Sequence, residues 1–306
     1  MNRLRNLAEG LGVFLFESGS PSAAAAFRIA FGVTLLIGQV AMLGDVELFF
    51  SGDGVLPNEV LTPNQFDALW SLLHLIDSPL WVRVIHCTLV VVTLCVAVGW
   101  RTRLMSVALF VLLISFRNRN PLVVNAGDQV AVLAAMWLIF LDAGHTRSVD
   151  AWLRREARPW HGAWALRMIQ IQLSVIYGLA ALHKLTDPDW LAGTMMFYFA
   201  AITNLWLIPM PWIMDHLWLC RMMTWGTILL EALLSIALWW RPTRAPLLIT
   251  GLLFHAFIFL LLGIPFFGLV MSSLLISFAP FDDSKPKDSR PSGEGRGAKI
   301  EAAPAG

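Results

Sequence analysis

Apolar stretches long enough to cross a membrane recur along this chain, and they limit its possible folds more than any other feature. A bilayer core about 30 Å thick needs roughly 20 apolar residues in a helix. By this measure we expect spans at residues 23–43, 81–99, 104–116, 122–141, 165–182, 222–240, 245–262 and 264–279. The composition agrees, because 57% of the 306 residues are hydrophobic and only 14% are charged, against about 25% in soluble domains. We therefore predict an all-α fold, a polytopic integral membrane bundle of about eight transmembrane helices.

Two regions of this pattern carry further expectations. The span at 104–116 is short for a bilayer, so we expect it to be tilted, kinked or shielded by its neighbours. The apolar stretch from 245 to 279 is too long for a single span. Gly263 and Pro265 are expected to divide it into two helices.

The distribution of charged loops predicts the orientation. Segment 44–80 holds several acidic residues but no Lys or Arg, whereas arginines precede the first span and recur in the loops at 101–103, 147–167 and 241–244. Loops rich in Lys and Arg stay on the cytoplasmic side. We therefore expect a multi-pass protein of the cell membrane with both termini cytoplasmic.

One loop disobeys this rule. The segment "RNRNP" at 117–121 places Arg117 and Arg119 on the outer side. Neighbouring spans can hold so short a loop in place, but an anion-binding or substrate-binding loop would have the same composition.

The chain divides into three regions. Residues 1–22 read as an amphipathic segment on the cytoplasmic surface, 23–280 as the transmembrane domain, and 281–306 as a disordered cytoplasmic tail. The formal net charge of +1 supplies no basic patch for nucleic acid. Three scattered cysteines favour neither a disulfide framework nor a thiolate metal site.

Ionisable residues inside spans are costly and therefore candidates for function, although polar side chains also join helices through hydrogen bonds. In the first span Arg28, Gly32 and Gln39 fall near one line and should face the protein interior. For Arg28 we expect a structural ion pair or snorkelling to the interface.

The fifth span carries a longer polar or small stripe. Its members lie at offsets of 0, 4, 7, 11 and 14 residues, and they are Gln170, Ser174, Tyr177, Ala181 and Lys184. Such spacing places them on one helix face, directed at other helices. His183 is rotated about 100° away from Lys184.

Two further groups of polar residues stand out. Asn125, Asp128 and Gln129 share a face at the start of the fourth span, where they would either bind substrate or pin the arginine loop. Glu231 and His255 lie within the sixth and seventh spans and could pair with each other structurally. The seven histidines show no metal-binding spacing, so no metal is predicted.

Five segments occur in an order that resembles a known family. They are "DGVLP" at 53–57, "RNRNPLVVNAGD" at 117–128, "LIFLDAGHTRSVD" at 138–150, "LAALHKLTDPDWLAG" at 179–193 and "FHAFIFLLLGIPFFGLVM" at 254–271. Together they resemble the HTTM family, the horizontally transferred transmembrane domain related to vitamin K-dependent gamma-glutamyl carboxylase. The resemblance covers about residues 20–280.

The resemblance implies a function. By position, Lys184 corresponds to the carboxylase lysine regarded as the base that deprotonates vitamin K hydroquinone. The implied cofactor is a reduced quinone of the menaquinol or vitamin K hydroquinone type, reached from the membrane. The implied outward-facing site combines Lys184 with Arg117, Arg119, Asn120, Asn125, Asp128, Tyr177, His183, Trp190 and His255.

Two departures from the carboxylases are visible. Ala126 stands where they carry a histidine, and a short tail stands where they have a large lumenal domain. Two function classes therefore stay open. The first is a quinol-dependent carboxylase or oxygenase. The second is a non-catalytic membrane factor for maturation or export of a secreted peptide, or of an extracellular partner protein, with Lys184 paired to Asp187 or Asp189.

Overall fold

The structure is a computed structural model that describes residues 2–17, 19–57, 60, 70–202, 207–261 and 263–281. All of its regular elements within these residues are helices, and none of these residues forms a strand. Five helices in the described part of the chain are long and apolar enough to cross a membrane. They are α2 (Pro21–Ala41), α5 (Pro79–Val98), α9 (Ala163–Lys184), α12 (Leu217–Ile236) and α13 (Arg241–Leu261). The all-α membrane bundle is therefore confirmed, while the count of eight spans stays a prediction.

The three other expected spans also coincide with helices, which are α6 (Thr102–Arg119), α7 (Ala126–Leu138) and α14 (Pro265–Leu275). α6 has 18 residues and is longer than the short third span that we expected. Because α6 continues to Arg119, the expectation of an arginine loop was wrong: Arg117 and Arg119 belong to its last turn. α7 has only 13 residues, fewer than the span predicted at 122–141.

Short helices occupy the ends and connections. Two elements precede α2: α1 (Asn2–Gly12) and the turn η1 (Val13–Glu17). Two short helices follow α2: α3 (Val46–Phe50) and η3 (Leu72–His74). The helix that precedes α9 is α8 (Val149–Leu153). The connection from α9 to α12 contains three short helices: α10 (Pro188–Ala192), α11 (Met195–Ala201) and η5 (Pro211–Asp215). The turns η6 (Ala237–Trp239) and η7 (Ile276–Phe278) follow α12 and α14. The predicted disordered tail lies, except for Phe281, outside the described residues.

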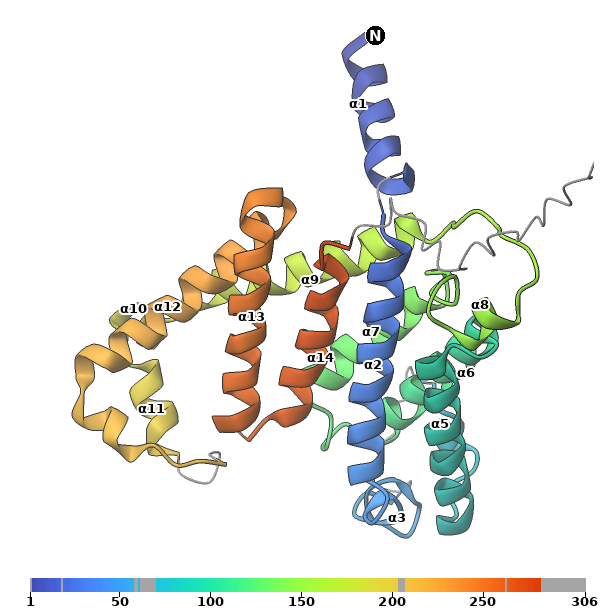
Figure 1. Cartoon of the computed structure of the whole chain (residues 1–306). Coiled ribbons are helices and arrows are strands. Elements are labelled where there is room, and N and C mark those ends of the chain that lie inside the picture. Colours follow the sequence, from blue (N-terminus) through green and yellow to red (C-terminus); the bar gives the residue numbers. More distant parts are fainter. Residues whose placement is uncertain are drawn as a thin grey trace, which may run out of the picture.

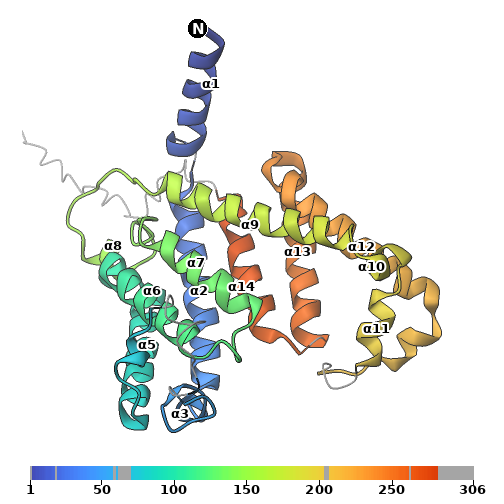
Figure 2. The same ribbon diagram turned by 180° about the vertical axis from the view of Figure 1, so that it is seen from behind.

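α2 and α14 lie at the centre of the bundle. α2 packs against α5 and α14, and α14 packs in turn against α7 and α13. In Figure 1 α2, α5, α13 and α14 run roughly side by side, whereas α9 and α12 cross them obliquely. Figure 2 shows α10 and α11 at the far end of α9 and α12, away from α5 and α6. A small apolar cluster of Met196, Ala200, Ile213 and Cys220 holds that end together.

The buried Arg28 fixes the segment between α7 and α8 to α2. Its side chain is fully buried, and it donates hydrogen bonds to the carbonyl oxygens of Ala143 at 2.8 Å and Arg147 at 2.6 Å. The expectation that Arg28 snorkels to the interface was therefore wrong, because its guanidinium donates hydrogen bonds to backbone carbonyl groups inside the protein. Carbonyl oxygens in an apolar interior need such donors.

Arg119 and Asn120 hold α3 and the segment that follows it in the same way. The buried guanidinium of Arg119 donates hydrogen bonds to the carbonyl oxygens of Ser51 at 2.8 Å and Leu56 at 2.9 Å. Asn120 donates to the carbonyl oxygen of Phe49 at 2.7 Å. These contacts give Arg119 a structural role: it anchors the segment that follows α3.

We predict that Arg119→Met lowers the free energy of unfolding by about 3 kcal/mol, because it leaves two buried carbonyl groups without a charged donor. Arg103→Met is the matched control, since Arg103 is an exposed residue of the same helix. It should change stability by less than about 0.5 kcal/mol. Unfolding in detergent, followed by tryptophan fluorescence, measures both. Equal midpoints for the two variants would show that the carbonyl contacts do not stabilise the fold.

Candidate functional site

The polar stripe predicted on the fifth span is a ladder of contacts between helices. Each polar member on α9 meets a different element, which confirms that the stripe faces other helices. Gln170 Nε2 donates to Ser277 O of η7 at 2.7 Å, Trp239 Nε1 of η6 donates to Ser174 Oγ at 2.9 Å, Tyr177 contacts α13, and Lys184 contacts α12. The small Ala181 is buried between them.

Lys184 and Glu231 form an ion pair between α9 and α12. The ammonium nitrogen lies 2.8 Å from Oε1 and 2.7 Å from Oε2 of the carboxylate, so both oxygens are engaged. The side chains are 16% and 9% exposed, respectively. The ring of Trp190 covers the ammonium at 4.9 Å from its centroid. The alternative that pairs Lys184 with Asp187 or Asp189 was therefore wrong.

Tyr177 and His255 form a second buried pair. Tyr177 Oη and His255 Nε2 are 2.7 Å apart, and the residues are 2% and 1% exposed. His255 Nδ1 has no hydrogen-bond partner among the described residues. The expectation that Glu231 and His255 pair with each other was wrong, because each binds a residue of α9 instead.

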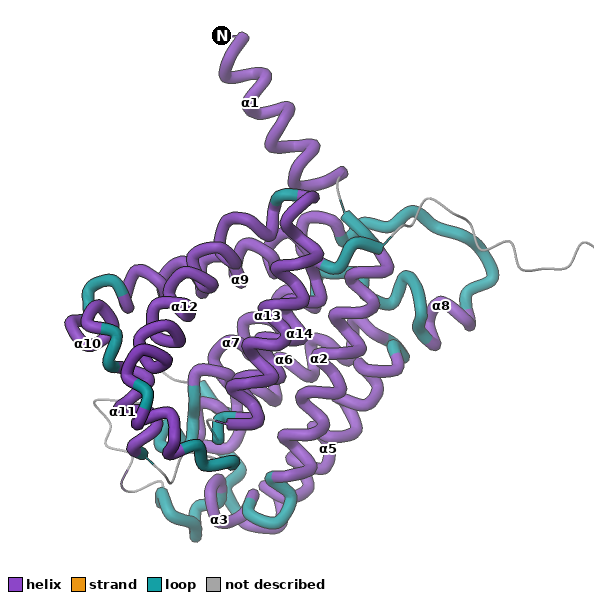
Figure 3. The backbone as a smooth tube through the Cα atoms, turned by 60° about the vertical axis from the view of Figure 1, so that its left-hand side comes forward, coloured by secondary structure: helices purple, strands orange, loops and turns teal. Residues whose placement is uncertain are grey.

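The two pairs lie close together. Tyr177 precedes Lys184 by two helical turns, about 10 Å along the axis of α9, and Glu231 interacts electrostatically with Tyr177. Figure 3 shows α9 and α12 side by side, and the two helices pack against each other. The four residues therefore form one polar group between three apolar helices, which we call the acid–base cluster.

The outer residues of the predicted site lie elsewhere. Asn125 and Asp128 form a capping box at the start of α7: Asn125 Oδ1 accepts from Gly127 N at 2.7 Å, and Asp128 Oδ2 accepts from Asn125 N at 2.8 Å. Arg117 donates to Gln129 Oε1 at 3.1 Å. Gln129 of α7 thus binds the last turn of α6, whereas Asn125 and Asp128 cap α7.

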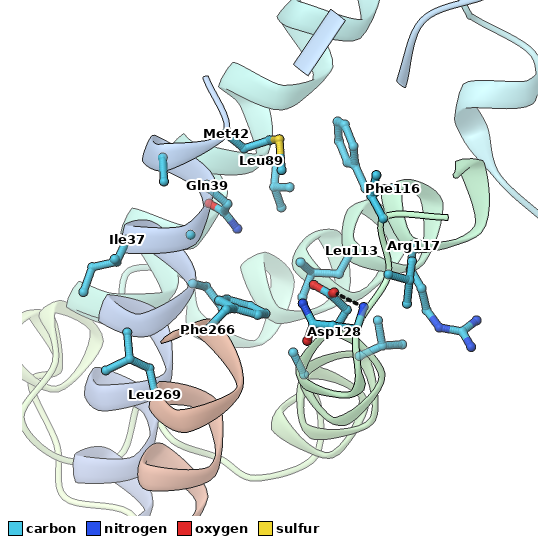
Figure 4. Close-up of a pocket in the computed structure, with 18 of the residues that line it drawn as sticks. Ile37, Gln39, Met42, Leu89, Leu113, Phe116, Arg117, Asp128, Phe266 and Leu269 are labelled. Carbon is cyan, nitrogen blue, oxygen red and sulfur yellow. Dashed lines mark hydrogen bonds between the residues drawn. The ribbon is translucent and has the colours of Figure 1, made fainter. Parts of the chain in front are cut away.

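A cavity of about 330 Å³ opens beside Arg117, Asn125 and Asp128. Most of its wall is aliphatic and aromatic, drawn from α2, α5, α6, α7, α13 and α14. Figure 4 shows Gln39 of α2 and Phe266 of α14 on one side and Leu113, Arg117 and Asp128 on the other. We call this space the outer cavity.

The site predicted as one unit is therefore divided. Arg117, Asn125 and Asp128 line the outer cavity, whereas Lys184, Trp190, Tyr177 and His255 do not line it. Arg119 and Asn120 anchor a loop. His183 is exposed on the other face of α9, as its rotation predicts.

Sequence reasoning described two residues of these sites incompletely and missed a third. Glu231 was recognised as a buried acid, but its partner was misassigned because Lys184 is 47 residues away in another span. Gln39 was expected only to face the interior. His86 was not singled out, since one histidine in an apolar helix gives no signal of its own.

The fold and these contacts define a class. The chain is a polytopic helical membrane protein with ionisable residues paired in its interior, which is the arrangement expected where such residues serve a function. The HTTM domain family model matches residues 16–282, and the chain belongs to this family.

Two relatives from Bacillus subtilis (strain 168) are similar over most of the membrane region. The uncharacterized protein YitO is 25% identical over 225 residues, which cover 62% of this chain and 64% of YitO. The sporulation-delaying protein SdpB is 22% identical over 265 residues, which cover 83% of this chain and 80% of SdpB. No solved structure matches the chain.

We predict that breaking the ion pair from one side destabilises the protein more than removing it whole. Glu231→Leu and Lys184→Met should each cost about 3 kcal/mol, because each leaves an unpaired buried charge. The double variant leaves no charge behind and should regain most of that loss. A double-mutant cycle of unfolding midpoints in detergent measures the coupling. Strictly additive losses would mean that the two charges do not stabilise each other.

Proposed function

We propose that this HTTM protein is a gamma-carboxylase-like membrane enzyme in which Lys184 acts as a general base toward a quinol. The observation that carries the proposal is the acid–base cluster. Lys184 is the last member of the α9 ladder and is paired with a buried carboxylate, and the hydrogen-bonded Tyr–His pair starts from the same helix two turns earlier. The position of Lys184 is also the one that the family resemblance assigns to the base.

A paired lysine can serve as a base if its proton can move to its partner. In water the ionic form of a Lys–Glu pair is strongly favoured. Apolar surroundings disfavour both charges, so the neutral amine–carboxylic acid pair comes closer in energy. Transfer of the proton from Nζ of Lys184 to Glu231 would leave a free amine, and the carboxyl group would hold the proton during the reaction.

Tyr177 and His255 form a second pair that can exchange a proton. Their 2.7 Å contact is short enough for such exchange. Glu231 interacts electrostatically with Tyr177, so the charge at Glu231 would influence this exchange. The proton of the Lys184 base itself would stay within the Lys184–Glu231 pair.

The residues around Lys184 are aromatic and aliphatic, which is the kind of surface that a quinol ring can pack against. The Trp190 indole offers an aromatic face beside the amine, and the exposed side chains of Leu185 and Leu191 flank it toward the membrane. A bound quinol would supply the proton that the base accepts and the electrons for an oxygen-dependent reaction. The outer cavity does not include Lys184, so we place this approach at the turn between α9 and α10.

We predict that Lys184→Arg lowers quinol turnover about a hundredfold or more while the protein stays folded. Arginine keeps the cation and the contact to Glu231, but a guanidinium is not deprotonated in proteins and cannot act as a base. The assay is oxygen-dependent consumption of menaquinol in lipid nanodiscs, followed by mass spectrometry. His183→Gln, on the exposed face of the same turn, is the control and should retain turnover. Wild-type protein without turnover would contradict the proposal.

The second candidate is a membrane factor for maturation or export of a secreted peptide. Its support is the similarity to the sporulation-delaying protein SdpB over 83% of this chain. In this role Lys184 would clamp α9 to α12 without giving up its proton. Lys184→Arg would then restore the secreted peptides that a deletion strain lacks, as measured by mass spectrometry of the medium, whereas a catalytic base would not tolerate the replacement.

A further inference from the structure

The outer cavity contains buried polar groups that have no partner among the described residues. Gln39 is 7% exposed, and neither its amide nitrogen nor its amide oxygen makes a hydrogen bond. His86 is 3% exposed; its Nε2 lies 2.8 Å from the carbonyl oxygen of Gln39, while its Nδ1 has no partner. Both residues line the cavity.

Unpartnered groups of this kind are unfavourable. A buried polar group without a hydrogen bond costs about 1–3 kcal/mol, and native proteins contain few of them. In Figure 4 the amide of Gln39 extends from α2 toward the cavity, between Met42 and Phe266. A ligand in the cavity would therefore gain from groups that α2 and α5 already present.

The free atoms specify the chemistry of that ligand. The amide nitrogen of Gln39 needs an acceptor such as a carbonyl oxygen, and its amide oxygen needs a donor such as a hydroxyl group. Nε2 of His86 faces a carbonyl oxygen and so carries the hydrogen, which makes Nδ1 of a neutral ring an acceptor that also needs a hydroxyl group. The complementary ligand has a carbonyl and hydroxyl groups close together.

The rest of the cavity wall indicates what the apolar part of the ligand is. Its walls are mostly aliphatic and aromatic, and its volume of about 330 Å³ is near the lower end for ligand pockets, which suits one chain rather than two. Ile37 at its edge is 52% exposed on the outside of α2, and Pro265 is also exposed. In a membrane, such an apolar edge faces lipid, so the ligand would enter from the bilayer.

We infer that the outer cavity binds a single-chain lipid whose uncharged polar end carries an ester or amide carbonyl and a hydroxyl group, as in a monoacylglycerol. The acyl chain lies against Leu89, Leu113 and Phe266, and the polar end meets Gln39 and His86. This site does not include Lys184, and the inference is independent of the function proposed above.

The test uses a monoacylglycerol probe with a diazirine group in its acyl chain. The purified full chain in lipid nanodiscs is irradiated with increasing probe, and labelled peptides are mapped by mass spectrometry. We expect saturable labelling of cavity-lining residues on α2, α7 and α14, and competition by unlabelled monoacylglycerol.

Two substitutions separate recognition by Gln39 from general lipid contact. Gln39→Leu keeps the volume of the side chain but removes its donor and acceptor, so the apparent affinity for the probe should fall about tenfold, the equivalent of about 1.4 kcal/mol. Gln172→Leu is the matched control, because Gln172 also has an amide without partners but does not line the cavity. It should leave labelling unchanged.

A second variant tests the site independently, in case Gln39→Leu fails to fold. Leu269→Trp would fill the cavity from α14 and should abolish saturable labelling without touching Gln39. Labelling that never saturates, equal affinity in wild type and Gln39→Leu, or equal losses in Gln39→Leu and Gln172→Leu would each overturn the inference. So would displacement of the probe by menaquinone but not by monoacylglycerol, since the occupant would then be a quinone.

Discussion

A bilayer core offers no water to polar groups, so a polar side chain between these helices needs a partner in the protein or in a bound ligand to offset the cost of its burial. The ladder on α9 meets this requirement along one face of a single helix, from Gln170 to Lys184. Because its partners come from α12, α13 and the turns η6 and η7, the ladder also fixes how these elements lie against α9. Packing and candidate chemistry thus depend on the same contacts.

The buried arginines show the same constraint at the two ends of the bundle. Arg28 binds the segment between α7 and α8 through carbonyl oxygens, and Arg119 binds the segment after α3 in the same way. Segments that resemble the family motifs therefore include structural anchors as well as candidate functional residues. Where the carboxylases carry a histidine, Ala126 begins α7, yet this chain places another histidine, His255, within the acid–base cluster.

The helices and the face of α9 could be predicted because both depend on local periodicity. Lys184 was predicted to face other helices and does so, but its partner could not be predicted, since pairing across 47 residues depends on how α9 crosses α12. The outer site was predicted as one unit because the family resemblance grouped its residues, among them the sequence neighbours Arg117 and Arg119. Helical geometry instead turns them to different faces, one toward the cavity and one into the loop.

The shortness of α7 has a consequence for its ends. Thirteen residues rise about 20 Å, less than the roughly 30 Å of the hydrocarbon layer, so the two ends of α7 cannot both reach a water interface. The first amides of a helix that begins below the surface cannot be hydrated. At the start of α7, Asn125 and Asp128 supply partners from within the chain: their capping box binds two amide groups without help from solvent.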